Sequence, residues 1–139
     1  MGTDERRVVV ERVGPGRFAV TNVRGGRISV GTGDDADFSP VELLLGAIGG
    51  CTSIDVDAVT SRRAPPDSFE VDVTANKVRD DGGNHLTDIE VTFRVAFPGG
   101  PEGDGARAVL PRIVEQSRDR LCTVSRTVEL GTPVSPGIA

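Results

Sequence analysis

Several residue types that build metal and cofactor sites are scarce in this sequence of 139 residues. It has one histidine, His85, two cysteines, and neither tryptophan nor tyrosine. A structural zinc site takes four Cys, His or carboxylate ligands, and iron–sulfur clusters are held by several thiolates. We therefore expect no metal centre, haem or other cofactor, and we interpret His85, which follows the turn residues "DDGGN", as a solvated loop residue.

Motifs for nucleotide binding and for serine hydrolases are also missing, as are long apolar runs. The sequence contains no Walker loop, no G-x-G-x-x-G and no G-x-S-x-G. Its longest apolar run, Leu43–Ile48, has six residues, whereas a bilayer span needs about 20. The first ten residues, "MGTDERRVVV", lack the apolar centre of a secretory signal. We expect a cytoplasmic protein that does not use a membrane.

The sequence has fewer basic than acidic residues, which gives a net charge of −5 at pH 7. Nucleic-acid binding depends on a basic face, so this balance argues against a nucleic acid as partner. The length suits one domain over residues 1–139, and neither an internal repeat nor a long linker divides it.

The order of strand and helix patterns predicts an α+β fold. Short β-rich runs joined by Gly and Pro turns come first, which is typical of an antiparallel meander, and an acidic loop follows. A long helix then precedes two strands with period-two alternation, a glycine-rich loop, a second helix that Pro111 either starts or kinks, and a last strand. The expected order is β-β-β-α-β-β-α-β, with strands at 7–13, 17–23, 27–30, 68–78, 86–97 and 125–134, helices at 40–62 and around 109–121, and loops at 31–38, 79–85 and 98–105.

The long helix carries a clear start signal and an apolar stripe. Ser39 is placed to be the N-cap, Pro40 suits the first helical position, and Glu42 completes a capping box. The apolar positions recur at helical spacing, so we expect this stripe to be buried. It comprises Leu44, Ala47, Ile48, Cys51, Ile54 and Ala58.

Three glycines, Gly46, Gly49 and Gly50, directly precede Cys51 in this helix. Each costs a helix about 0.8–1 kcal/mol relative to alanine, so something must offset them. One interpretation is close packing against another helix, from this chain or a second subunit. The other is that they also clear space for a substrate beside Cys51.

Two segments resemble the OsmC/Ohr family, the osmotically induced and organic-hydroperoxide-resistance proteins. "SPVELLLGAIGGCTSIDV" resembles the central helix of that family, and "RDRLCTVSRTVE" resembles its second cysteine segment. The resemblance implies antiparallel sheets wrapped around a long central helix in an intertwined homodimer. It also implies a cysteine-dependent reduction of organic hydroperoxides, in which Cys51 attacks, Cys122 resolves, and a dithiol, often of lipoyl type in the family, restores the thiols.

Activation of Cys51 needs a nearby cation, because an unperturbed thiol has a pKa of about 8.5 and Cys51 lies beyond the first helical turn. The family resemblance implies an arginine from the N-terminal strands that a glutamate holds. Arg17 is the best match, with Arg12, Arg24 and Arg27 as alternatives.

Glu42 is the candidate for that glutamate, although the family has the carboxylate one position earlier, at Val41 here. One residue rotates a helical position by about 100°, so Glu42 either reaches the arginine or serves only the capping box. The sequence leaves a second function open, a dimeric small-molecule-binding or redox-sensing protein without efficient peroxidase activity. In a third interpretation both cysteines are buried structural thiols.

Overall fold

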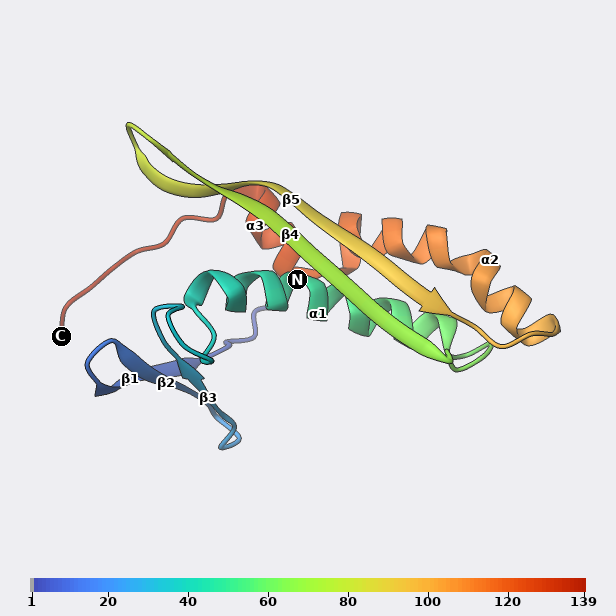
Figure 1. The fold of residues 1–139 in the computed structure, drawn as a ribbon, viewed down its shortest axis with the longest axis horizontal. Coiled ribbons are helices and arrows are strands. Elements are labelled where there is room, and N and C mark those ends of the chain that lie inside the picture. Colours follow the sequence, from blue (N-terminus) through green and yellow to red (C-terminus); the bar gives the residue numbers. More distant parts are fainter. Residues whose placement is uncertain (1) are drawn as a thin grey trace. The chain divides into compact units, whose positions relative to one another are not determined.

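The computed structural model of the chain describes residues 2–139. Internal contacts divide the chain into an N-terminal unit that ends at Leu44 and a C-terminal unit that begins at Leu45. The elements follow the order β1, β2, β3, α1, β4, β5, α2, η1, α3 (Figure 1).

The N-terminal unit is the expected antiparallel meander. It consists of β1 (Val8–Gly14), β2 (Arg17–Asn22) and β3 (Arg27–Val30), paired in that order. Val10 faces Val20, which in turn faces Ile28, so one face of this sheet is apolar.

Helix α1 (Pro40–Thr60) begins with the predicted capping box and ends two residues before the expected boundary. The Ser39 N–H donates to Oε1 of Glu42 at 2.8 Å, and the Glu42 N–H donates to Oγ of Ser39 at 3.2 Å. These hydrogen bonds lower the pKa of the Glu42 carboxyl. The reciprocal pair satisfies two N–H groups that have no partner inside the helix.

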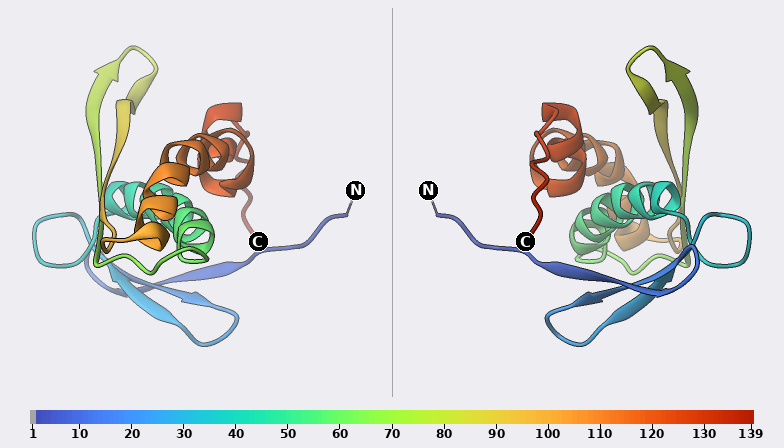
Figure 2. Two further views of the ribbon diagram at one scale, coloured as in Figure 1. Left: turned by 90° about the vertical axis from the view of Figure 1, so that its right-hand side faces the viewer. Right: turned by 90° about the vertical axis from the view of Figure 1, so that its left-hand side faces the viewer.

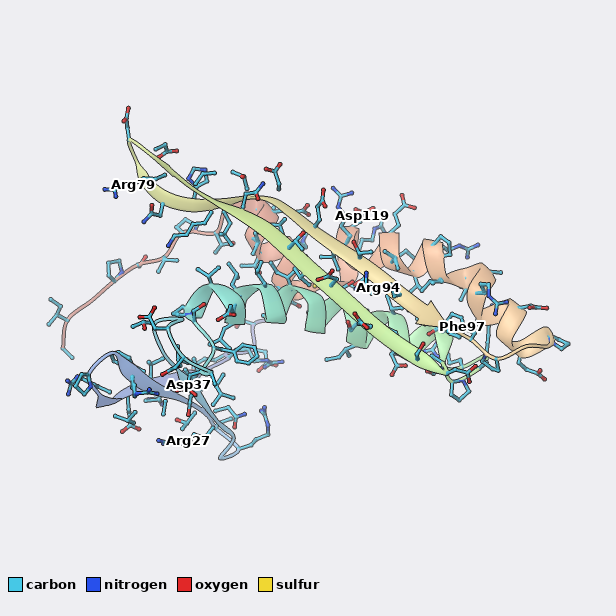
Figure 3. All side chains as sticks on the ribbon, viewed as in Figure 1. Arg27, Asp37, Arg79, Arg94, Phe97 and Asp119 are labelled. Atoms are coloured by element: carbon cyan, nitrogen blue, oxygen red, sulfur yellow. The ribbon has the colours of Figure 1, made fainter. Side chains whose placement is uncertain are left out.

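The C-terminal unit contains a long hairpin of β4 (Ser68–Asp80) and β5 (Gly83–Ala96), joined by a two-residue turn. Its inner side chains are apolar, and α1, α2 and α3 all lie against this face (Figure 2). The facing inner pairs are Phe69 with Val95, Val71 with Phe93, and Val73 with Val91. The outer face is charged, where Arg94 pairs with Glu70 and Asp72 (Figure 3).

Helix α2 (Pro101–Gln116) starts inside the segment expected to be a loop, so the 98–105 loop prediction is wrong. Proline is favourable in the first turn because its missing N–H needs no partner there. A side chain at Gly103 would lie 1.7 Å from the carbonyl oxygen of Pro98, so this glycine permits a close approach of backbone. Pro111 lies within the helix and does not start it.

The prediction of a last strand at 125–134 is also wrong. One π-helical turn, η1 (Ser117–Leu121), is followed by α3 (Thr123–Leu130). Cys122 caps the start of α3, and Gly131 ends it with a φ of 63°, a conformation that glycine adopts at little cost. The α+β class is confirmed, with a helix in place of the final strand.

The buried row of α1 differs from the predicted stripe. Ile48, Thr52, Val56 and Thr60 are buried, whereas Ile54 is 72% exposed. The predicted positions Leu44, Ala47 and Ala58 are exposed as well. The helix therefore packs through a neighbouring row and keeps an apolar face uncovered within a single chain.

The core cluster of the C-terminal unit, formed by Ala64, Phe97 and Ala106, closes the end of the hairpin where β5 leads into α2 (Figure 3).

Among residues 2–139, α1 is the one helix whose length and hydropathy would suffice for a bilayer span. Central helices of soluble domains meet the same criterion.

Candidate functional site

The C-terminal unit brings Cys51 and Cys122 together, although they are 71 positions apart (122 − 51). Cys51 comes from the middle of α1, and Cys122 lies at the junction of η1 and α3. Both are free thiols, and each acts on the pKa of the other, so their side chains lie close together. Cys51 is half-buried and Cys122 is fully buried, so the sulfur of Cys51 is the more accessible one.

Hydrogen bonds at the start of α3 favour the thiolate of Cys122. The Ser125 N–H donates to Sγ of Cys122 at 3.3 Å, and Oγ of Ser125 also lies 3.3 Å from this sulfur. Burial raises the pKa of the Cys122 thiol, but the hydrogen bonds with Ser125, Cys51 and the backbone of Val124 outweigh it and lower the pKa overall. A helix N-terminus is a common setting for such a thiol.

Cys51 has the opposite tendency. Burial raises the pKa of its thiol, and Cys122 and Asp55 raise it further, while a backbone hydrogen bond with Val124 acts against them. The pKa values of the two thiols therefore shift in opposite directions, and the surroundings favour the ionised form of Cys122 more than that of Cys51.

Sequence reasoning missed two side chains that act on the thiols, Ser125 and Asp55. Ser125 occupies the third position of α3, so the pattern C-x-x-S would have indicated an N-cap had this segment been recognised as a helix. Asp55 is one helical turn after Cys51, a spacing that places both residues on one side of α1.

A cavity of about 240 Å³ lies beside this pair, between the inner face of β5 and the helices. Neither cysteine lines it, but Ser125 does, and Ser125 contacts Cys122. Most of the wall is apolar. Arg118 and Glu129 also line the cavity and approach each other to 3.7 Å. The lining residues contributed by β5 are Ile89, Val91 and Phe93, and the other apolar ones are Ile48, Val114 and Val128.

Arg17 and Glu42 both have defined partners within the N-terminal unit. Arg17 pairs with Asp35, and with Asp37 at 2.9 Å. Glu42 makes the capping-box contacts with Ser39. The role that the sequence assigns to these two residues beside Cys51 stays a prediction. Among residues 2–139, no cluster of three His, Cys, Asp or Glu side chains could hold a metal ion.

Comparison with solved structures identifies the same fold in several bacterial proteins. An OsmC-like protein of unknown function from Vibrio cholerae has a TM-score of 0.74 and 13% identity, over 91% of this chain and 95% of that one. A hypothetical protein from Aquifex aeolicus has a TM-score of 0.73 and 20% identity, over 94% and 91%. The organic hydroperoxide resistance protein OsmC from Legionella pneumophila has a TM-score of 0.58 and 11% identity, over 91% of each chain.

A search of the curated proteins found no match. The family model described as "OsmC-like protein" matches residues 31–136, a segment that includes both cysteines and every helix. The chain belongs to the OsmC-like protein family.

Proposed function

We propose that the protein is a thiol-dependent peroxidase that reduces organic hydroperoxides in defence against oxidative stress. The observation that carries the proposal is the pair of neighbouring free thiols, of which Cys51 is the more exposed and Cys122 has the lowered pKa. The name of the Legionella pneumophila protein, which includes organic hydroperoxide resistance, supports the same chemistry.

Cys51 is the attacking thiol in this mechanism because its sulfur is the more exposed of the two. In this proposal Cys51 passes its proton to the neighbouring Cys122 thiolate as it attacks. The Cys51 sulfur bonds to the terminal oxygen of the hydroperoxide, the O–O bond breaks, and the leaving alkoxide takes that proton from Cys122, which is again a thiolate. The products are a sulfenic acid on Cys51 and an alcohol.

Cys122 resolves the sulfenic acid. Its sulfur attacks the Cys51 sulfur, and hydroxide leaves as water after protonation, which gives a Cys51–Cys122 disulfide. A low thiol pKa favours this step, since a larger fraction of Cys122 is ionised at neutral pH. An external dithiol, of which a lipoyl group is one form, then reduces the disulfide by two thiol–disulfide exchanges and becomes a disulfide itself.

The cavity beside Ser125 provides a place for the alkyl part of a substrate. Apolar surface covered there is worth about 25 cal/mol per Å², so a bulky organic hydroperoxide would be favoured over hydrogen peroxide. Equal rate constants for the two peroxides would contradict this part of the proposal.

The protein acts as a homodimer in this proposal, with the uncovered face of α1 against the same face of a second copy. Ile54 is 72% exposed on that face, and a Cβ on Gly46 or Gly50 would meet nothing within 4 Å in the single chain. Ile54→Glu should yield a folded monomer by light scattering, whereas Val78→Glu near the hairpin tip should not change the mass. A wild-type protein that is monomeric at micromolar concentration would refute the dimer.

The decisive experiment follows thiol oxidation by mass spectrometry after one equivalent of an organic hydroperoxide. The wild-type protein should form the intramolecular disulfide, and turnover should then consume a dithiol. Cys51→Ser should abolish turnover, while Cys122→Ser should react once and progress to sulfinic acid, because no second thiol resolves it. First oxidation at Cys122 would reverse the assignment. No oxidation of either thiol would refute the peroxidase and favour a binding or sensing protein.

A further inference from the structure

A chain of polar side chains crosses between α1 and the end of α2 close to the thiol pair. The Ser117 hydroxyl donates to Oδ2 of Asp55 at 2.7 Å, and Oγ1 of Thr52 lies 2.8 Å from Oγ of Ser117. A hydroxyl has one hydrogen to donate, so Thr52 is the donor to Ser117. Ser117 is fully buried and Thr52 is 5% exposed. A buried hydroxyl without a hydrogen-bond partner would cost free energy of folding. The Thr52–Ser117–Asp55 hydrogen bonds give both hydroxyls a partner.

Ser117 also determines where Cys122 lies. Its carbonyl oxygen accepts the N–H of Cys122 at 2.8 Å, the bond that closes the π-helical turn η1. An α-helical turn would instead pair Ser117 with the residue before Cys122, and each residue of shift rotates a side chain by about 100°. The side chain of Ser117 is therefore hydrogen-bonded to α1, while its backbone carbonyl fixes the position of Cys122.

Asp55 connects this anchor with the electrostatics of Cys51. The groups that act on the Cys51 thiol are the Cys122 thiol and the Asp55 carboxylate, together with the backbone of Val124. Arg118 in η1 and Glu129 in α3 line the neighbouring cavity and lie 3.7 Å apart as an ion pair. A negative charge one turn from Cys51 opposes a second negative charge on it.

We propose that Asp55 is a positioning residue for the thiol pair, because through Ser117 it anchors the turn that carries Cys122. The assignment rests on the proposed function for its catalytic meaning, but the geometry is independent of turnover. The Asp55 carboxylate is also one of the groups that raise the pKa of the Cys51 thiol.

The test compares Asp55→Asn with Asp57→Asn in the full-length, reduced protein. Asparagine at 55 keeps an oxygen that accepts from Ser117 but removes the charge. Asp57 lies on the same helix, is exposed and contacts Ser61, so its variant is a control for the same change in net charge. The rate of iodoacetamide modification is measured for each cysteine against pH by peptide mass spectrometry.

Asp55→Asn should shift the Cys51 profile to lower pH and raise its modification rate at neutral pH several-fold, while Asp57→Asn leaves the profile unchanged. Ser117→Ala should slow disulfide formation by a mild oxidant several-fold, and Ser117→Thr should restore it. An unchanged Cys51 profile in Asp55→Asn, or an equal shift in both variants, would overturn the proposal. A protein that shows the shift but does not consume hydroperoxide would refute the peroxidase and leave the positioning role intact.

Discussion

Alanine at each glycine of α1 tests how the central helix packs. A Cβ on Gly49 would lie 2.6 Å from Cγ2 of Val73 and 3.7 Å from Cγ1 of Val71, so β4 presses on the helix at this point. A Cβ on Gly46 or Gly50 would meet nothing within 4 Å inside the chain. The three positions share one helix and one substitution, but only Gly49 has a close neighbour.

The expected energies follow from two opposing effects. Glycine to alanine in a helix gains about 0.8–1 kcal/mol, and overpacking a well-filled interior costs about 1–3 kcal/mol. Within a single chain, Gly46→Ala should therefore raise the free energy of unfolding by about 1 kcal/mol. Gly49→Ala should range from neutral to a loss of about 2 kcal/mol, because the propensity gain offsets part of the clash.

Urea denaturation at two protein concentrations measures these differences. A Gly49→Ala variant as stable as Gly46→Ala would show that β4 does not restrict this position, and would refute the packing argument. Gly50→Ala distinguishes the two interpretations of the exposed face. It should stabilise an isolated chain as Gly46→Ala does, but in the proposed dimer it should lower stability and make the midpoint more dependent on concentration.

Three further predictions concern the thiol, the cavity and the helix start. Ser125→Ala should raise the pKa of Cys122 and lower its iodoacetamide reactivity at neutral pH. Because Ser125 depresses the folded-state pKa of Cys122, the stability that this shift contributes is present above the ordinary thiol pKa and is lost as pH falls through the folded value. In pH-dependent urea melts, the variant should therefore show a weaker rise in stability across that pH range. Val114→Phe should fill part of the cavity of about 240 Å³ and reduce turnover of a bulky hydroperoxide more than that of hydrogen peroxide in a coupled assay, and an equal reduction would place the substrate elsewhere. Ser39→Ala should cost about 1 kcal/mol in thermal unfolding, and Glu42→Gln should remove the stability that wild type loses as pH falls through the lowered carboxyl pKa; an unchanged acid profile would contradict that role for Glu42.

Local signals in the sequence predicted most of the fold. The meander, the capping box and the alternating hairpin all follow from spacing and turn residues, and the structure confirms them. The errors lie where one residue decides a conformation through a distant contact. "PGGPEGDG" is typical of a loop, but Gly103 allows the backbone of Pro98 to pack against a helix. "SRTVELGTPV" has the composition of a strand, but the caps at Cys122 and Gly131 make its first half helical.

The site could be predicted in part. The motifs identified both cysteines, and the structure brings them into contact. Periodicity alone could not tell which row of α1 packs inside the chain, because both rows are apolar enough to be buried. The roles of Asp55 and Ser117 could not be predicted from the sequence. Their contact joins two helices 62 positions apart and needs a π-helical turn that no sequence pattern indicates.

The separation of the two cysteines along the chain links redox state to the lifetime of the folded protein. A bond between Cys51 and Cys122 would close a loop of 71 residues, which in the chain-entropy treatment removes about 4 kcal/mol of freedom from the unfolded ensemble. The two thiols are already neighbours in the folded chain. Oxidised molecules would then unfold far less readily than reduced ones and would be cleaved more slowly by a protease. In a mixed population, a short protease treatment would therefore remove the reduced molecules and leave those recently oxidised by peroxide.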